Sequence, residues 1–159
     1  AMSQPDPTIR DEVARLRDTI STHREAMLDK DALLGHLGAL GWKVTPQDDA
    51  GTLRSTHQTD EGEVRVFVRL QKNWLIASVV PFLATRGDNS FELARWLLRV
   101  NRDMYQAKFA YDEDGDVVLT LELPTESLDP SEIRGALTTL LDQTVAHRRT
   151  LRLASGGIS

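Results

Sequence analysis

Two neighbouring stretches of the chain carry its clearest strand patterns. In residues 64–70, apolar side chains alternate with charged or aromatic ones, which is the period of two expected of a strand with one buried face. Residues 74–82 form an almost continuous apolar run, which predicts a central strand buried on much of both faces. Only the turn residues 71–73 separate the two stretches. The pattern therefore predicts a β-hairpin at the centre of the fold.

The segment after this hairpin has the features of a helix. Asn89 can cap it, because its side chain can accept hydrogen bonds from the first free amides, and Glu92 stands three residues further on, as in a capping box. Apolar residues then recur at helical spacing as far as Val100 and cover a wide stripe. We expect most of this helix's circumference to be covered, with the helix lying across a sheet or between layers.

A second hairpin and a C-terminal helix follow. Residues 107–111 and 117–123 both alternate, and the Asp114-Gly115 pair between them is a common hairpin turn. The next helix begins where Asp129 can cap it, with proline in its first turn and Glu132 three residues after the cap.

On the N-terminal side of the central hairpin, the sequence predicts a helical piece over residues 29–41, capped by Asp29 or Asp31, then a short strand at 42–44 and a polar strand at 52–58. Together the elements predict an α+β fold. Its sheet is mostly antiparallel, with about five strands, and helices flank it in the order helix or helices, strands, helix, hairpin, helix.

Residues 6–28 have a different pattern, a narrow helical seam. Its apolar positions follow steps of four and three, the spacing of a coiled coil, and charged residues fill the other faces. A seam of this kind is too apolar to stay in water, so we expect an interface formed by Ile9, Val13, Leu16, Ile20 and Met27. Its occupant is expected to be the same helix of a second copy, because symmetric pairs are the commonest assembly. The chain's own C-terminal helix and a client protein stay open as alternatives.

The domain organisation follows from these patterns. We predict an N-terminal heptad-like helix at residues 6–28, a single α+β domain at 29–153 and a flexible tail at 154–159. A length of 159 residues with 40% hydrophobic and 27% charged residues is typical of one globular domain that folds without disulfides.

Charge and hydropathy narrow the function classes. A net charge of −5 disfavours nucleic-acid binding, which draws on clustered positive potential. No apolar run has the length needed to cross a bilayer, and the N-terminus lacks the apolar core of a signal peptide. The absence of cysteine favours a cytoplasmic location. We therefore expect no nucleic-acid partner and no membrane partner.

No residue pattern predicts catalysis, a cofactor or a metal. The four histidines are far apart in the sequence, and no cysteine could complete a soft metal site. The acidic run at 112–116 lacks the glycine and glutamate positions of a calcium loop, so we interpret it as a hairpin turn. Ser155, before two glycines in the tail, has no strand-turn-helix context for a nucleophile.

The three tryptophans and a pair of arginines each have a structural and a functional interpretation. Trp42, Trp74 and Trp96 could form a stacking platform, but each lies in or beside an apolar element, which favours the core. Arg65 and Arg69 share a strand face with Phe67 and could bind an anion; a solvated outer face, or pairing with cross-strand carboxylates, is the more common arrangement.

Several phrases resemble a known family. They are Leu37-Gly38-Ala39-Leu40-Gly41-Trp42, Ser78-Val79-Val80-Pro81, Leu97-Leu98-Arg99-Val100-Asn101-Arg102, and Ala107-Lys108-Phe109-Ala110-Tyr111-Asp112 with Leu119-Thr120-Leu121-Glu122-Leu123-Pro124. Over residues 33–145 the chain resembles the YbjN-like family of bacterial proteins, whose fold is similar to that of type III secretion chaperones. The resemblance implies a small, non-enzymatic α+β domain that is often dimeric. The helix at 6–28 falls outside it.

The functional prediction is a non-enzymatic, cytoplasmic adaptor or chaperone-like regulatory domain that acts through protein–protein interaction. We expect a homodimer with a further protein partner that the sequence does not identify. The alternative is a small-molecule-binding regulator or enzyme with a pocket between helices and sheet.

Overall fold

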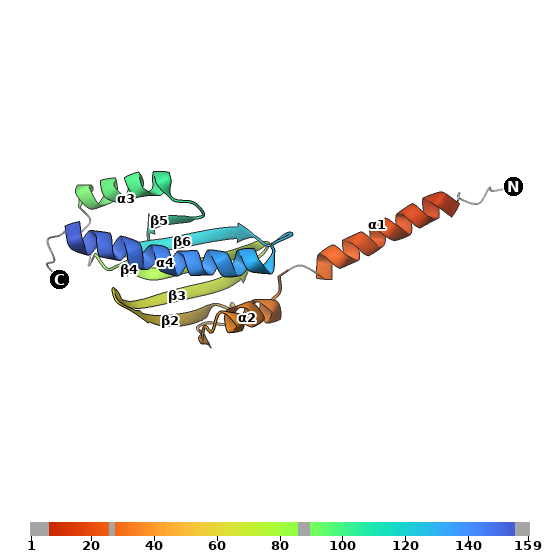
Figure 1. Ribbon diagram of the computed structural model, residues 1–159, viewed down its shortest axis with the longest axis horizontal. Coiled ribbons are helices and arrows are strands. Elements are labelled where there is room, and N and C mark those ends of the chain that lie inside the picture. The colour runs from red at the N-terminus through yellow and green to blue at the C-terminus, as the bar shows by residue number, and fades with distance from the viewer. Residues whose placement is uncertain (1–6, 26–27, 86–89, 155–159) are drawn as a thin grey trace.

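A computed structural model describes residues 7–25, 28–85 and 90–154. Within the first helix it describes the side chains of residues 8–17. The elements, in chain order, are α1 (Pro7–Glu25), α2 (Lys30–Ala39), β1 (Val44–Pro46), β2 (Leu53–Thr59), β3 (Gly62–Gln71), β4 (Trp74–Leu83), α3 (Phe91–Asp103), β5 (Ala107–Tyr111), β6 (Val117–Pro124) and α4 (Pro130–Ala154). Figure 1 shows α1 pointing away from the body that the other elements form.

The strands form one antiparallel sheet in the order β1-β2-β3-β4-β6-β5. Both expected hairpins are present, β3–β4 and β5–β6, and β6 returns to pair with β4 after the chain has passed through α3. The α+β class and the antiparallel sheet are confirmed. The sheet has six strands because Val44–Pro46 pairs with the start of β2.

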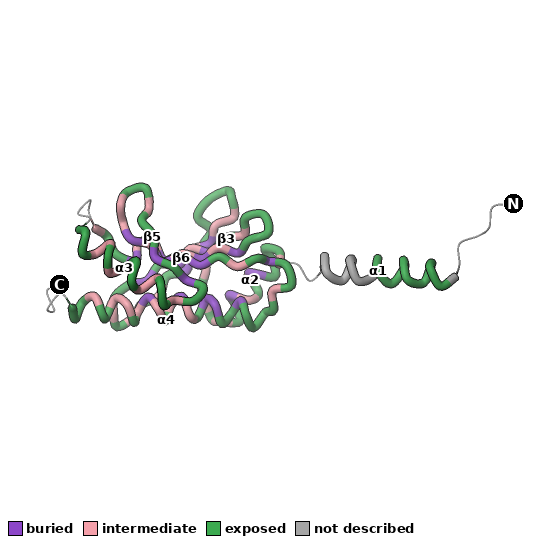
Figure 2. Tube along the Cα trace, turned by 90° about the horizontal axis from the view of Figure 1, so that it is seen from above, coloured by how far each residue is buried: buried purple, intermediate pink, exposed green. Residues whose placement is uncertain are grey.

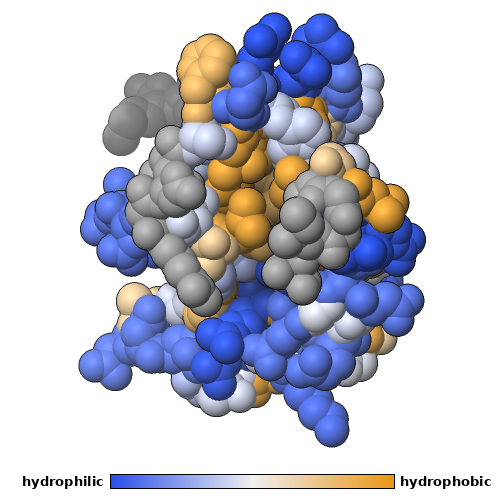
Figure 3. Space-filling view, turned by 90° about the vertical axis from the view of Figure 1, so that its left-hand side faces the viewer, coloured by the Kyte–Doolittle hydropathy of each residue, from blue (hydrophilic) through white to orange (hydrophobic). Residues whose placement is uncertain are grey.

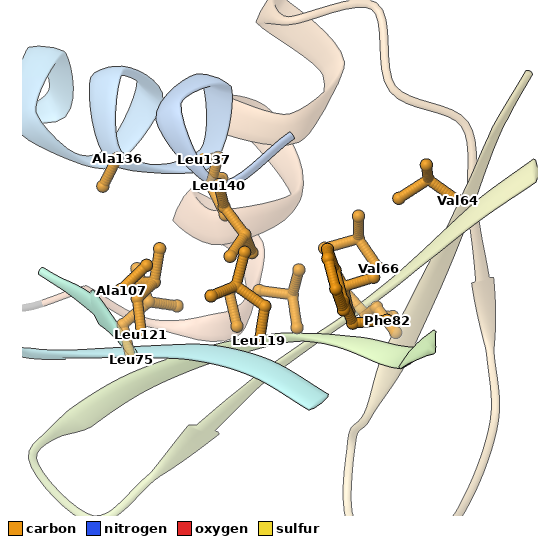
Figure 4. Close-up of a cluster of buried hydrophobic side chains, with 14 of the residues drawn as sticks. Val64, Val66, Leu75, Phe82, Ala107, Leu119, Leu121, Ala136, Leu137 and Leu140 are labelled. Atoms are coloured by element: carbon orange, nitrogen blue, oxygen red, sulfur yellow. The ribbon is translucent and has the colours of Figure 1, made fainter. Parts of the chain in front are cut away.

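One face of the sheet carries the core. The central inward residues of β3, β4 and β6 are at most 2% exposed, Leu70 and Leu123 at the strand ends are partly buried, and Leu137 and Leu140 of α4 are fully buried against them. Figure 4 shows these side chains meeting between α4 and the strands. Figures 1 and 2 show α2 and α4 on the same side of the sheet. Burial of this one apolar face is what joins the helices to the sheet.

The outer residues of β4 are less buried than we expected. Ile76, Ser78 and Val80 are half-buried, and no described helix lies over them. Side chains of the neighbouring strands cover them partly. For example, the Ser78 hydroxyl hydrogen-bonds the Thr120 hydroxyl of β6 at 2.8 Å. The apolar run of β4 therefore belongs to a sheet with one covered face, and its outer side forms part of the molecular surface.

The helix starts follow the predicted chemistry with one change. Asp29 caps α2 by accepting a 2.7 Å hydrogen bond from the amide of Ala32. Asp129 accepts from the amide of Ser131, and Glu132 accepts from the amide of Asp129, so the capping box of α4 is confirmed. For α3 the prediction of Asn89 was wrong. Ser90 is the capping residue and accepts from the amide of Leu93 at 3.0 Å; Asn89 lies outside the described residues.

The expectation that α3 is covered on most sides was also wrong. Leu97 is its only described residue in the buried class, whereas Phe91 is 76% exposed and Leu98 is 70% exposed. The reason is the position of α3, which lies beside β5 at the end of the sheet instead of across it (Figure 1). Its inner side meets the sheet through Trp96 and Phe109, whose ring centroids are 5.9 Å apart.

Asn101 of α3 closes the outer edge of β5. Its amide nitrogen donates to the carbonyl of Phe109 at 3.0 Å, and its amide oxygen accepts from the Phe109 amide at 2.7 Å. The side chain thus makes the two hydrogen bonds that a neighbouring strand would make. At the opposite edge, β1 has three residues and ends in Pro46, which has no amide donor. Both sheet edges are therefore poor templates for an added strand.

We predict that Asn101→Ala lowers the free energy of unfolding by about 1–3 kcal/mol, because it removes two partly buried hydrogen bonds and leaves the Phe109 amide without a partner. Urea denaturation followed by circular dichroism measures the change. Arg99→Ala, at an exposed position of the same helix, is the control and should stay within about 0.5 kcal/mol of wild type. Equal losses in the two variants would show that the edge contact does not set the effect, since alanine is a better helix former than either residue it replaces.

Candidate interaction surfaces

The seam predicted on the N-terminal helix lies on α1. Ile9, Val13 and Leu16 are 57%, 43% and 63% exposed. The Ile20 side chain and Met27 lie outside the part that the structure describes. The three described apolar side chains of the seam are thus open to contact by another molecule, and which molecule covers them stays a prediction.

A second exposed apolar stripe runs along the outside of α3. Phe91, Leu98 and Tyr105 are 76%, 70% and 89% exposed and stand seven residues apart. Residues seven apart lie on one side of a helix, so Phe91 and Leu98 share the face that points away from the sheet. Arg95 and Arg102 fall between them on that face. The sequence analysis missed this stripe because it assigned the apolar residues of α3 to the interior; the step of seven was the available signal.

The end of the molecule where α3 begins and α4 ends is also apolar. Figure 3 shows hydrophobic side chains gathered in the middle of this end, between segments drawn in grey. Two further large apolar residues are exposed: Leu83, the last residue of β4, at 37%, and Leu153, near the end of α4, at 63%. Exposed apolar patches of this kind are typical of protein-binding surfaces.

The face of the sheet opposite α2 and α4 forms a third surface, which we call the open face. It is formed by the outward residues of the strands, among them Arg54 on β2, Arg65, Phe67 and Arg69 on β3, and Trp74 and Ile76 on β4. A hollow of about 300 Å³ lies on it, lined by Gln71, Lys72, Trp74, Ile76 and Glu122. Trp74 is 45% exposed, so the expectation that all three tryptophans fill the core was wrong for this one.

The arginines of the open face differ in their partners. Arg65 pairs with Glu63 on its own strand at 2.7 Å, so this acid partner lies along the strand and not across it. Arg54 and Arg69 make no ion pair with any residue that the structure describes. Arg54 lies directly opposite Phe67, and Arg69 directly opposite Ile76. The sequence analysis named Arg65 and Arg69 but missed Arg54, because pairing β2 with β3 required the register.

A separate arginine cluster on α4 is fully used by the fold. Arg149 and Arg152 bind the carboxylate of Glu61, in the β2–β3 turn, at 3.1 Å and 2.9 Å. Arg148 donates to the carbonyls of Pro81, Phe82 and Glu63, and its guanidinium lies over the Phe82 ring at 5.7 Å. These contacts fasten the C-terminal half of α4 to two strands and leave the three guanidinium groups engaged.

Glu61 is the most strongly perturbed acid in this cluster. Its side chain is 5% exposed, and the hydrogen bonds from Arg152, and then from Arg149, lower its pKa from 4.5 to about 2. Burial acts in the opposite direction, but the two guanidinium groups outweigh it. Glu61 therefore keeps its negative charge, and its grip on α4, to well below pH 4.

The acidic turn after β5 has a structural role. Asp112 accepts hydrogen bonds from the amides of Asp114 and Asp116, both at 2.9 Å, and Asp116 accepts from the amide of Thr85 at 2.9 Å. Carboxylates committed to amides in this way shape the turn and tie it to the end of β4. Among the residues that the structure describes, no group of three or more histidines and acids is placed to hold a metal ion.

The two histidines of the sheet side pack as core residues. His57 hydrogen-bonds the Ser55 hydroxyl at 2.9 Å and stacks edge-on against Trp42. His147 of α4 lies edge-on to Phe109 and Trp96, and burial lowers its pKa below 6.5. Trp42 and Trp96 thus contribute to the interior, as expected.

No helix in the described ranges has the length and apolar character to cross a membrane.

The comparisons with known proteins identify the family. The family model for YbjN, described as "Putative bacterial sensory transduction regulator", matches residues 29–153. The chain belongs to the YbjN family. The match leaves out α1, so the exposed seam of this chain lies outside the YbjN match. No curated protein matches the chain.

Two solved structures share the fold of this YbjN family member at low sequence identity, and a third is more weakly similar. YbjN from E. coli is 15% identical, with 81% of this chain and 94% of that chain covered and a TM-score of 0.60. A chain of the ExsC–ExsE complex is 22% identical, with coverage of 76% and 90% and a TM-score of 0.57. The Yersinia pestis type III secretion chaperone SycH, in complex with a fragment of YscM2, is 18% identical, with coverage of 72% and 94% and a TM-score of 0.48.

We predict that Glu61→Gln changes the acid response of the fold. The folded pKa of Glu61 is depressed, so its contribution to stability is fully present above pH 4.5 and is lost as the pH falls to about 2. The stability difference between wild type and Glu61→Gln should therefore shrink over this interval. Urea denaturation at a series of pH values measures it. Asp60→Asn, one residue away and without a salt bridge to any described residue, should track wild type; a constant gap for Glu61→Gln would disprove the assignment.

Proposed function

We propose that this protein is a non-enzymatic adaptor or chaperone-like regulatory domain that binds a partner protein in the cytoplasm. The observation that carries the proposal is the pair of large exposed apolar side chains on one face of α3, Phe91 and Leu98, with the exposed Tyr105 two residues beyond the end of the helix. Removing apolar side chains of this size from water lowers the free energy, and exposed patches of them are typical of protein interfaces.

The family and fold support a binding role. The YbjN family is described as regulatory, and the ExsC–ExsE structure, which shares the fold, contains two different proteins. In this chain, the carboxylates of the acidic turn are engaged by backbone amides. Turns of this kind serve the scaffold, so these carboxylates are not free to act on a ligand.

A small-molecule-binding regulator is the second candidate, and the hollow beside Trp74 is the observation that favours it. Its volume of about 300 Å³ is at the lower end for ligand sites. It lies on the open face of the sheet, whereas the sequence analysis expected a pocket between helices and sheet. A lining that combines one exposed tryptophan with Lys72 and Glu122 suits a side chain of a partner as well as a free ligand.

We further propose that the α1 seam pairs two copies of the chain. Ile9, Val13 and Leu16 are exposed in the single chain, and α1 points away from the body, so a second α1 can reach the seam (Figure 2). In a parallel pair, Glu12 lies beside the seam next to Arg17 of the other copy, which favours pairing by charge as well as by burial.

Affinity capture with the full chain tests the binding role. We expect a specific protein to be retained by wild type and lost from a variant with Phe91→Ser and Leu98→Ser, because the change removes two exposed apolar anchors while leaving the core intact. The variant with Arg95→Gln and Arg102→Gln alters the same face without removing an apolar side chain and serves as the control. Ligand-induced thermal stabilisation by a small metabolite, with no protein retained, would favour the second candidate.

Sedimentation equilibrium tests the pairing of α1. Leu16→Glu places a charge on the seam and should weaken the dimer by at least about tenfold, because the charge would be buried opposite its copy. Ala14→Glu adds the same charge on the opposite side of the helix and should leave the dimer unchanged. If both variants remain dimeric, the pair is held elsewhere, with the outer stripe of α3 as the next surface to test; a monomeric wild type would end the pairing proposal.

A further inference from the structure

The open face of the sheet holds two arginines that form no ion pair with any described residue and that both neighbour an aromatic side chain. Arg54 is directly opposite Phe67 on β2, and Arg69 is two residues along β3 from Phe67. Neither arginine makes a hydrogen bond or ion pair with a described residue, whereas the arginines of α4 are all engaged. A guanidinium group in this state retains its full capacity to bind a carboxylate in bidentate geometry.

The acids around these arginines are held by other groups. Asp48, in the loop before β2, accepts hydrogen bonds from the amides of Ala50 and Thr52, both at 3.0 Å. Glu63 is bound by Arg65 and by Gln58. The charge of Arg69 acts on Asp48 and that of Arg54 acts on Glu63 at longer range, but neither arginine is in ion-pair contact with these carboxylates.

The hollow on the open face adjoins the arginines. Ile76, which lines it, is directly opposite Arg69, and Trp74 is directly opposite Gln71 on the next outward position of β3. Its volume of about 300 Å³ is room for one or two inserted side chains, and Trp74 presents a partly exposed ring to them. An apolar contact site beside Trp74 and the positive charge of Arg69 thus lie on neighbouring strands of the same face.

The partner must lie on the face and not extend the sheet. Asn101 occupies the hydrogen-bonding positions of Phe109 at one edge, and the three-residue β1 with Pro46 forms the other. A sheet with one bare face is most readily completed by a helix laid across it, since a helix satisfies its own backbone hydrogen bonds.

We infer that the open face binds a helical segment of a partner protein whose acidic side chains pair with Arg54 and Arg69 while an aromatic or leucine side chain enters the hollow beside Trp74. The inference rests on the proposed function and adds to it the surface and the chemistry of the partner. A nucleic acid fits less well, because the chain carries a net charge of −5.

The test uses defined probes and the full chain. A fluorescein-labelled, helix-forming peptide carries Glu and Asp beside a stripe of Leu and Phe; a second peptide has Lys and Arg in place of the acids, and an oligothymidine represents nucleic acid. Fluorescence anisotropy measures their binding to wild type, to Arg54→Gln with Arg69→Gln, and to Arg99→Gln with Arg134→Gln. The last pair removes the same charge from exposed helical positions away from the open face and is the matched control.

We expect wild type to bind the acidic peptide and not the basic one. Loss of Arg54 and Arg69 should weaken that binding at least about tenfold, and the helical control pair should change it by less than about threefold. In ¹H–¹⁵N spectra the indole N–H of Trp74 should shift on binding, while those of Trp42 and Trp96, packed on the other side of the sheet or beside it, should not. Circular dichroism checks that both double variants fold.

Three results would overturn the inference: acidic peptide bound equally by both double variants, preference for the basic peptide, or oligothymidine bound through the same two arginines. The partner captured under the proposed function is then titrated against these variants. Equal binding to all of them would leave the adaptor role standing and remove the open face as its site. A wild-type chain that captures no protein and binds no peptide would refute both.

Discussion

The structure depends on the burial of one face of one sheet. The inward residues of β3, β4 and β6 are almost completely withdrawn from water, and α4 supplies the leucines that cover them. Because the register of an antiparallel sheet is fixed wherever one face is apolar, this burial also determines which residues point outward. The positions of Arg54, Phe67, Arg69 and Ile76 on the outer face are thus consequences of the core on the inner face.

Two sets of polar contacts stabilise the sheet and α4 where apolar burial ends. Asn101 completes the hydrogen bonding of β5, and the Glu61 carboxylate joins the β2–β3 turn to the last turns of α4. Both act at ends where apolar burial is thinnest, and both use groups from distant parts of the chain. They close the edge of the sheet and fix the helix while leaving its outer face and the outer side of α3 available.

How far the sequence determined this picture varies by element. Strands with strong alternation, the Asp129 cap and the Asp112 turn could be predicted, because the evidence for them is local: a period of two, a cap three residues from its acid, a glycine in a hairpin. The placement of α3 could not, because an apolar stripe predicts burial without saying whether a sheet or another molecule covers it. The partners of Arg148 and Glu61 could not either, since they join residues brought together only by the register and by the path of α4.

The net charge of the chain did not predict which arginines are paired with acids, because the pairing depends on residues that only the fold brings together. The chain is acidic overall, yet its arginines differ in how they are held: Arg148, Arg149 and Arg152 of α4 are bound by Glu61 and by carbonyls, whereas Arg54 and Arg69 form no ion pair with a described acid. An engaged guanidinium stabilises the fold and offers little to a partner, because a second carboxylate would have to displace the first. An unengaged one beside an apolar hollow costs the isolated chain little in water and gains a strong partner when a carboxylate arrives from outside. The distribution of acids among the arginines, and not their number, therefore decides which guanidinium groups hold the fold together and which stay available on the outer face of the sheet.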